Sequence, residues 1–134
     1  MTAMRVYIPV SAGDLIDRIT ILQIKKEHIP DPRKLVNVDN ELQSLIAIRN
    51  CFPRLAAKLI RTKERQLYKA NKILWDTEDE IRALESRGSF DKAFIASARR
   101  VYRTNDRRAK LKREINTLAG SVLREEKWFS QERA

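Results

Sequence analysis

Hydrophobic residues recur every three or four positions along most of this chain, the spacing that places them on one face of an α-helix. Ser11 and Asp31 are suitable N-caps for the first two runs, and Ser89 is suitable for the last. Pro30 and Gly88 are suitable stops between helices. The pattern predicts four helices, over residues 12–29, 32–49, 54–87 and 90–119, and a short terminal helix over residues 122–129.

Residues 4–10 follow a different pattern, because apolar side chains alternate with others as in a β-strand. Pro9 removes one backbone donor, so this segment cannot be a central strand. We therefore expect it to be extended. It would either lie across the helices or pair with the edge of another chain.

The third predicted helix carries the clearest seam for packing against another helix. Its buried positions keep a strict rhythm of three and four, typical of antiparallel pairs: Leu67, Ala70, Leu74, Thr77, Ile81 and Leu84. The two long helices should form a hairpin around Gly88, so the expected fold is an all-α antiparallel helical bundle in one domain, residues 1–134. A helix of about thirty residues spans about 45 Å, more than a compact bundle of this mass needs, so we expect a homodimer that covers the far ends.

The last long helix contains a conflict along one ridge. Val101, Asn105, Arg108, Lys112 and Ile115 have the spacing of buried positions, yet the three middle side chains are polar or charged. Burying such groups is costly unless each finds a partner. The ridge is therefore either turned towards water or built into a polar cluster, as a binding site would be.

Composition narrows the class of protein. The 134 residues include only three Gly and four Pro, which favours helices over a turn-rich sheet protein. Cys51 is the single cysteine, so no intrachain disulfide can form, and no signal peptide or apolar run of membrane-spanning length is evident. We therefore expect a soluble cytoplasmic protein.

The net charge of +10 favours an anionic partner, such as nucleic acid, phosphate, an acidic protein or a membrane surface. In a hairpin that turns at Gly88, the basic stretches 54–72 and 104–113 face each other, which predicts a strongly positive end away from the turn. The acidic residues of 76–80 lie roughly opposite the arginines of 99–103 and can be neutralised there. The positive end is either a solvated surface or an anion site.

A first group of candidate site residues lies on the third predicted helix: Trp75, Glu78, Asp79 and Arg82. The carboxylates around it could bind a divalent metal, as in some helical nucleotide pyrophosphatases, but those sites need two separate acidic motifs. One acidic cluster is better explained by a salt-bridged face, so no metal is expected.

A second group lies on the last long helix: Tyr102, Asn105, Asp106, Arg108, Lys112 and Arg113. Its amide, guanidinium and ammonium groups form a cradle of hydrogen-bond donors suited to a carboxylate or phosphate. The alternative is that Asp14, Asp17 or Glu78 neutralises these donors in a buried polar network. The sequence leaves both readings open.

The remaining polar residues offer little chemistry. Ordinary surface pairing explains Asp14, Asp17 and their basic neighbours on the first helix. His28 is the only histidine, so a zinc site is not expected. Ser11 has no nearby base and no Gly-rich phosphate loop is present, so neither nucleophilic catalysis nor a cofactor is expected.

Three stretches of the chain resemble the signature segments of an uncharacterised bacterial family, a domain of unknown function: residues 10–22 (VSAGDLIDRITIL), 74–82 (LWDTEDEIR) and 101–116 (VYRTNDRRAKLKREIN). The resemblance implies a helical protein with no established activity, whose relatives occur beside domains linked to cell-surface sugar transfer. The motif positions it implies are Ser11, Gly13, Asp17, Lys25, Trp75, Glu78, Asp79, Arg82, Tyr102, Asn105, Asp106, Arg108, Lys112, Arg113 and Asn116.

Four functions are compatible with these features. The leading hypothesis is a binding module that holds an anionic small molecule or acidic partner between the two groups of candidate residues. The second is an enzyme acting on a phosphorylated or dicarboxylate substrate, by analogy with other all-helical enzymes. The third is nucleic-acid binding by the basic hairpin end, although no recognition motif supports it. The fourth is a structural oligomerisation or adaptor domain in which the polar ridge fixes helix register.

Overall fold

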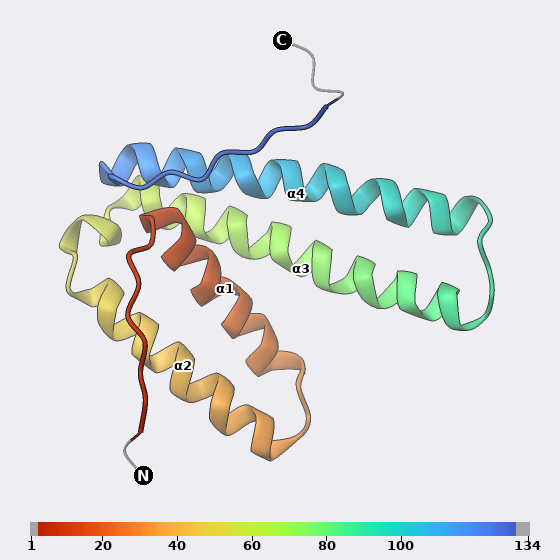
Figure 1. Cartoon of the computed structure of the whole chain (residues 1–134), viewed down its shortest axis with the longest axis horizontal. Helices are drawn as coiled ribbons and strands as arrows, with labels where there is room; N and C mark the ends of the chain where they lie inside the picture. The colour runs from red at the N-terminus through yellow and green to blue at the C-terminus, as the bar shows by residue number, and fades with distance from the viewer. Residues whose placement is uncertain (1–2, 131–134) are drawn as a thin grey trace.

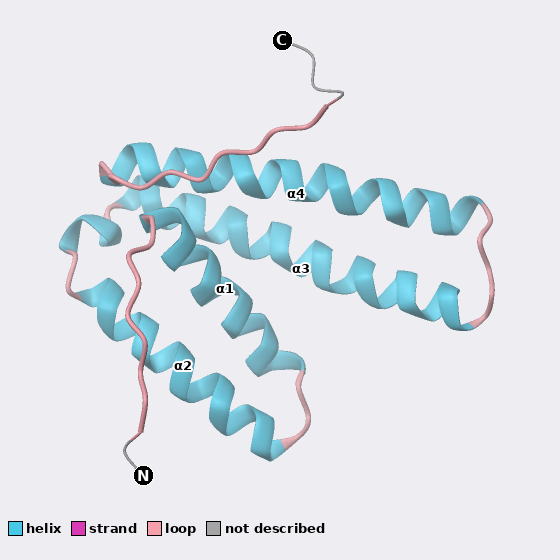
Figure 2. Ribbon diagram, in the orientation of Figure 1, coloured by secondary structure: helices cyan, strands magenta, loops and turns pink. Residues whose placement is uncertain are grey.

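The computed structural model describes residues 3–130 and contains helices but no strand in that range (Figures 1 and 2). The four α-helices are α1 (Ala12–His28), α2 (Pro32–Asn50), α3 (Lys58–Ser86) and α4 (Lys92–Ala119). A short 3-10 helix, η1 (Pro53–Ala56), precedes α3. The prediction of an all-α fold is confirmed.

Helix α1 lies at the centre of the fold. It packs against α2 on one side and against both α3 and α4 on the other, while α3 and α4 form the most extensive helix pair (Figure 1). The core is made by side chains of all five elements: Leu15, Ile16, Ile19, Leu22, Val38, Leu42, Leu55, Ile60, Leu67, Ala70, Leu111 and Ile115. The side of α4 that meets α1 also carries the polar ridge.

The predicted long hairpin forms around Gly88. Gly88 has a φ of 65°, in the left-handed region that glycine adopts without strain, and it ends α3. The two helices are then linked by the ion pairs Lys63–Glu114 (2.5 Å) and Arg100–Glu80 (3.6 Å). These pairs agree with the antiparallel register expected from the sequence.

Helix α1, with α2 on its far side, covers only the half of the hairpin that lies away from its turn (Figure 1). Helix α1 ends at His28, whose ring centroid lies 5.5 Å from that of Trp75. Beyond this contact, no other helix within residues 3–130 covers the hairpin (Figure 1). The long helices therefore extend past the bundle, as their length predicts.

The predicted start of the third helix is wrong. The α-helix begins at Lys58 rather than Arg54. Pro53 instead starts the 3-10 helix, and Ala57 has an extended ψ of 143°, which separates that turn from α3.

The predicted cap of the last long helix is also displaced. Asp91, not Ser89, caps α4, because its carboxylate accepts a hydrogen bond from the Ala93 amide at 3.1 Å. Helix α4 therefore begins two residues later than its pattern indicates.

The terminal helix expected over residues 122–129 does not form. Gly120, with a φ of 67°, ends α4 in the left-handed conformation and reverses the chain. The segment after it runs back along α4 without helical structure (Figure 1). Its Glu125 is held by Lys112 at 2.5 Å, so a side-chain contact positions this tail.

The N-terminal segment lies across α2. Arg5, Val6 and Tyr7 line a groove together with the α2 residues Asn40 and Leu45. These residues have neither helical nor strand hydrogen bonding. Of the two arrangements expected for an extended segment, the structure contains the one across a helix.

Candidate functional site

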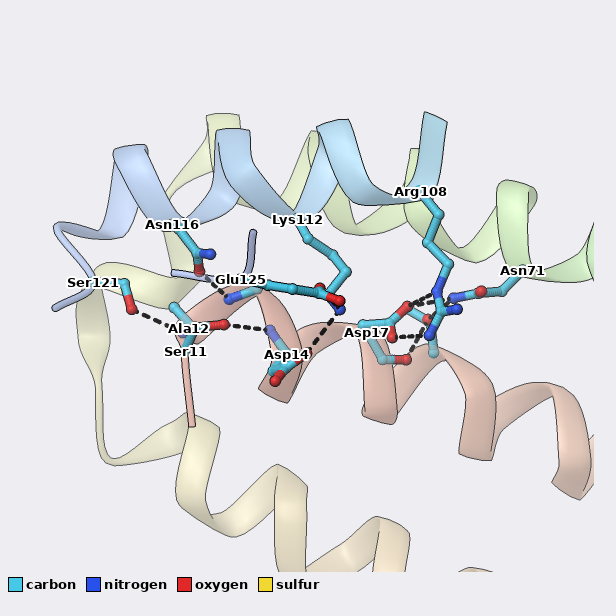
Figure 3. A network of polar contacts seen from close by, with 12 residues as sticks. Ser11, Ala12, Asp14, Asp17, Asn71, Arg108, Lys112, Asn116, Ser121 and Glu125 are labelled. Carbon is cyan, nitrogen blue, oxygen red and sulfur yellow. Dashed lines mark hydrogen bonds and ion pairs between the residues drawn. The ribbon is translucent and has the colours of Figure 1, made fainter. Parts of the chain in front are cut away.

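The polar ridge of α4 faces α1 and forms a network with it (Figure 3). Arg108 donates from Nε to Asp17 Oδ1 at 2.9 Å and from Nη2 to Asp17 Oδ2 at 2.5 Å. This is the two-pronged geometry in which a guanidinium holds a carboxylate most firmly. Asp17 is only 2 % exposed, so a buried carboxylate neutralises the charge of Arg108.

A second donor to the Asp17 carboxylate comes from α3. Asn71 donates from Nδ2 to Asp17 Oδ1 at 2.8 Å and to Thr20 Oγ1 at 2.9 Å. Thr20 in turn donates its hydroxyl to the Asp17 carbonyl at 2.8 Å. The hydrogen bonds from Arg108 to Asp17 also raise the pKa of the guanidinium, which stays charged at every working pH.

Lys112 forms the second half of the network. Its Nζ lies 2.8 Å from Asp14 Oδ1 on α1 and 2.5 Å from Glu125 Oε2 in the tail. Burial alone would lower the pKa of Lys112, but the hydrogen bonds to the two carboxylates outweigh it, so that pKa is raised. The ammonium is therefore held charged between two partners.

The first turn of α1 touches the last turn of α4. The Gly13 amide donates to Asn116 Oδ1 at 2.6 Å, and the Ala12 amide donates to Ser121 Oγ at 3.2 Å. A Cβ on Gly13 would lie 2.5 Å from the Lys112 carbonyl oxygen, closer than real contacts allow. Only glycine fits here, and side chains of the α4 end satisfy the open amides of the α1 terminus.

These contacts match the second reading of the ridge, a buried polar network, and leave the ligand site a prediction. Asp14 and Asp17 neutralise Lys112 and Arg108, as the alternative from the sequence expected, whereas Glu78 is exposed. The expectation that Asp17 pairs only at the surface is wrong, because a contact with α4 that is remote in sequence buries it. The network joins α1 to α4 through two ion pairs.

The other predicted site residues are not brought together. Trp75 and Asn105 are half-buried. The rest are exposed: Glu78, Asp79, Arg82, Tyr102, Asp106 and Arg113. Arg103 lowers the pKa of Tyr102 by hydrogen bonding, with its guanidinium carbon 5.9 Å from the ring centroid. The assignment of these residues, and of Arg108 and Lys112, to a ligand stays a prediction.

An open groove lies between α3 and α4 at the basic end of the hairpin. It has a volume of about 650 Å³ and is lined by Lys63, Lys110, Arg113, Glu114, Thr117 and Leu118. The sequence indicated this end through its two facing basic stretches. It did not indicate Lys63 and Lys110 individually, because neither interrupts an apolar pattern.

Several network residues escaped the sequence reasoning. Asn71 and Thr20 look like ordinary helix-surface residues, and Glu125 lies in a segment expected to be helical. A signal existed for one bonded pair: Gly13 and Asn116 are both among the motif positions that the resemblance implies. The others become visible only when α1, α3 and α4 are placed together.

Residues 3–130 contain neither a metal-binding cluster nor a membrane-spanning helix. No group of three or more His, Cys, Asp or Glu side chains is arranged to hold a metal ion. None of the described helices combines the length and apolar character needed to cross a bilayer.

Comparison with known proteins identifies the family of this chain. No curated protein and no solved structure matches the chain. A model described as a family of unknown function, DUF6165, matches residues 4–132 and so covers the elements that build the network. The chain therefore belongs to this family of unknown function.

Proposed function

We propose that this domain is a helical binding module that holds an acidic segment of a partner protein in the basic groove between α3 and α4. The observation that supports it is the groove lining, in which three cations, Lys63, Lys110 and Arg113, accompany a single carboxylate, Glu114. A concave surface with excess positive charge attracts and retains anions.

The charge of this groove is only partly compensated. Glu114 pairs with Lys63 at 2.5 Å, and both side chains are about one-third exposed. Lys110 and Arg113 are exposed and form no ion pair with any residue of 3–130. Arg107, one helical turn before Lys110, is exposed as well and extends the positive surface.

The ridge itself supports this function less well than the groove does. Arg108 and Lys112 already hold carboxylates, so a ligand there would have to displace Asp17 or Asp14. The groove is also open, whereas sites for small molecules bury most of their ligand. An extended acidic chain fits an open groove better, because it can contact several cations at once.

The test is binding of a fluorescent oligoglutamate peptide, followed by anisotropy at about 0.1 M and about 0.5 M salt. The variant Lys110→Glu/Arg113→Glu should weaken binding by about tenfold or more. The matched control is Arg33→Glu/Lys34→Glu on α2, which changes the net charge equally at exposed positions away from the groove. The control should bind within about twofold of the unmodified protein.

Equal losses in both double variants would mean that net charge alone attracts the peptide, and would overturn the proposal. Pyrophosphate and a single-stranded oligonucleotide serve as competitors. If the oligonucleotide displaces the peptide at far lower concentration through the same two residues, the groove is a nucleic-acid site instead. If pyrophosphate does so, it is a small-anion site.

A further inference from the structure

The outer half of the hairpin lacks a core of its own. Past the contact between His28 and Trp75, and among residues 3–130, α3 and α4 pack only on each other. In the range 76–104 the buried side chains are Thr77, Leu84 and Ser97, two of them polar. Large apolar side chains lie in water on the same segment: Phe90 (57 % exposed), Ile95 (55 %) and Tyr102 (54 %). Two helices alone are a marginal unit.

One side of this outer half continues the surface that α1 covers in the inner half. On α3, Asn71 and Trp75 contact α1, and Glu78 and Arg82 follow at spacings of three and four. These positions share one helical face. This face of α3 is therefore covered by α1 at Asn71 and Trp75 and exposed to solvent at Glu78 and Arg82.

Helix α4 has a matching face. Asn116 and Lys112 contact α1, and the same spacing leads through Asn105 to Tyr102, Ala98 and Ile95. We define the outer face as Glu78, Arg82, Ile95, Ala98 and Tyr102. All five are exposed.

We infer that the outer face binds a second copy of this chain, so that two hairpins form an antiparallel four-helix bundle. A two-fold axis crossing α3 near Glu80 places Glu78 of each copy opposite Arg82 of the other. The Glu80–Arg100 contact puts the same axis near Arg100 on α4. There it places Tyr102 opposite the small Ala98 of the second copy.

Self-complementarity favours a second copy over an unrelated partner. Glu78 and Arg82 form no ion pair within residues 3–130, and a two-fold contact satisfies both with one geometry. The same two-fold axis pairs the large Tyr102 side chain of one copy with the small Ala98 side chain of the other. A different protein would have to supply both complementarities separately.

The size of the face indicates a weak dimer. About twelve residues of α3 are uncovered, a length of about 18 Å, and two helices side by side are about 20 Å wide. With interdigitating side chains, the two copies would bury roughly 800–1,000 Å² in total, below the roughly 1,200–2,000 Å² of stable interfaces and in the range of weak association. We therefore expect a micromolar dissociation constant rather than an obligate dimer.

The test is sedimentation velocity on the full chain from about 1 to about 200 µM. The unmodified protein should shift from monomer to dimer within this range. Glu78→Arg and Arg82→Glu should each weaken the dimer about tenfold or more, since each places like charges opposite one another. The double variant Glu78→Arg/Arg82→Glu should restore it, because the swapped charges again face their opposites.

Glu41→Arg is the matched control, since it makes the same charge change at an exposed position of α2 and should leave the dimer intact. A protein that stays monomeric at the highest concentration overturns the inference, as does a dimer that neither single variant weakens. Failure of the double swap to recover association also overturns it. Both charges are exposed, so circular dichroism of each variant should show an unchanged helix content.

This dimer is independent of the basic groove. Its residues lie near the hairpin turn, whereas Lys110 and Arg113 lie towards the opposite end. Glu78→Arg should therefore leave oligoglutamate binding unchanged, which separates the two proposals.

Discussion

Replacing Arg108 by methionine would measure how far the fold depends on the α1–α4 network. Methionine keeps most of the aliphatic stem but removes both hydrogen bonds to Asp17. The buried carboxylate would keep one side-chain donor, Asn71. Removing one partner of a buried ion pair costs about 3–5 kcal/mol, because the other charge stays buried.

The exposures of the two partners refine this magnitude. The Arg108 side chain is 29 % exposed and that of Asp17 only 3 %. Water can enter where the guanidinium was, so we expect the lower end of the range, about 3 kcal/mol. Asp17→Asn should cost less, about 1–2 kcal/mol, because the remaining guanidinium can reach water. The double variant should lose only about 1 kcal/mol, since no buried charge remains.

Urea unfolding followed by far-ultraviolet circular dichroism gives these free energies directly. Arg107→Met is the matched control, as an exposed neighbour without an ion pair among residues 3–130, and should change stability by less than about 0.5 kcal/mol. The reasoning is refuted if Arg108→Met loses no more than this control. It is also refuted if Asp17→Asn is the more damaging single change.

Three further substitutions test single contacts. Gly13→Ala should destabilise the fold by about 3 kcal/mol, because the new Cβ would collide with the Lys112 carbonyl. Helix propensity alone would instead favour alanine by up to about 1 kcal/mol. The sign of the change in thermal unfolding temperature distinguishes the two effects. The raised pKa of Lys112 means that its stabilisation is complete below its unfolded pKa, about 10.4, and is lost as pH rises through the folded value. The gap in urea midpoint between the unmodified protein and Lys112→Met should accordingly narrow from about pH 8 to about pH 11. Gly88→Ala should cost about 1 kcal/mol from its φ of 65° alone, since no atom lies within 4 Å of the added Cβ, and helix content should stay unchanged.

Spacing predicted the helices well wherever an apolar face meets the core. The rhythm from Leu67 to Leu84 identified α3 because five of its six positions are buried. The expected helix over residues 122–129 failed, because its apolar side chains have no core to meet. Trp128 is 78 % exposed and Val122 is 95 % exposed. Local propensity without burial does not hold a helix of that length.

The site shows a similar division. The conflict on the α4 ridge was visible in the sequence, since Arg108 and Lys112 occupy positions with buried spacing. The partners of Arg108 and Lys112 were harder to predict, because a carboxylate on the first helix looks like an ordinary surface charge. Asp17 becomes a buried anchor only through a contact with a residue 91 positions away. Spacing reveals which face is buried but not what lies against it.

The separation between Asp17 and Arg108 has a consequence for synthesis on the ribosome. Helix α1 emerges first, with a carboxylate on the side it must later bury. Its counter-charge is 91 residues away, which at typical elongation rates takes roughly 5–20 s to be made. During that interval α1 can pair with α2, but tight docking on the early part of α3 would strand an uncompensated charge. The ion pair can form only after α4 has been synthesised. Complete closure of the core around Asp17 should therefore wait for α4.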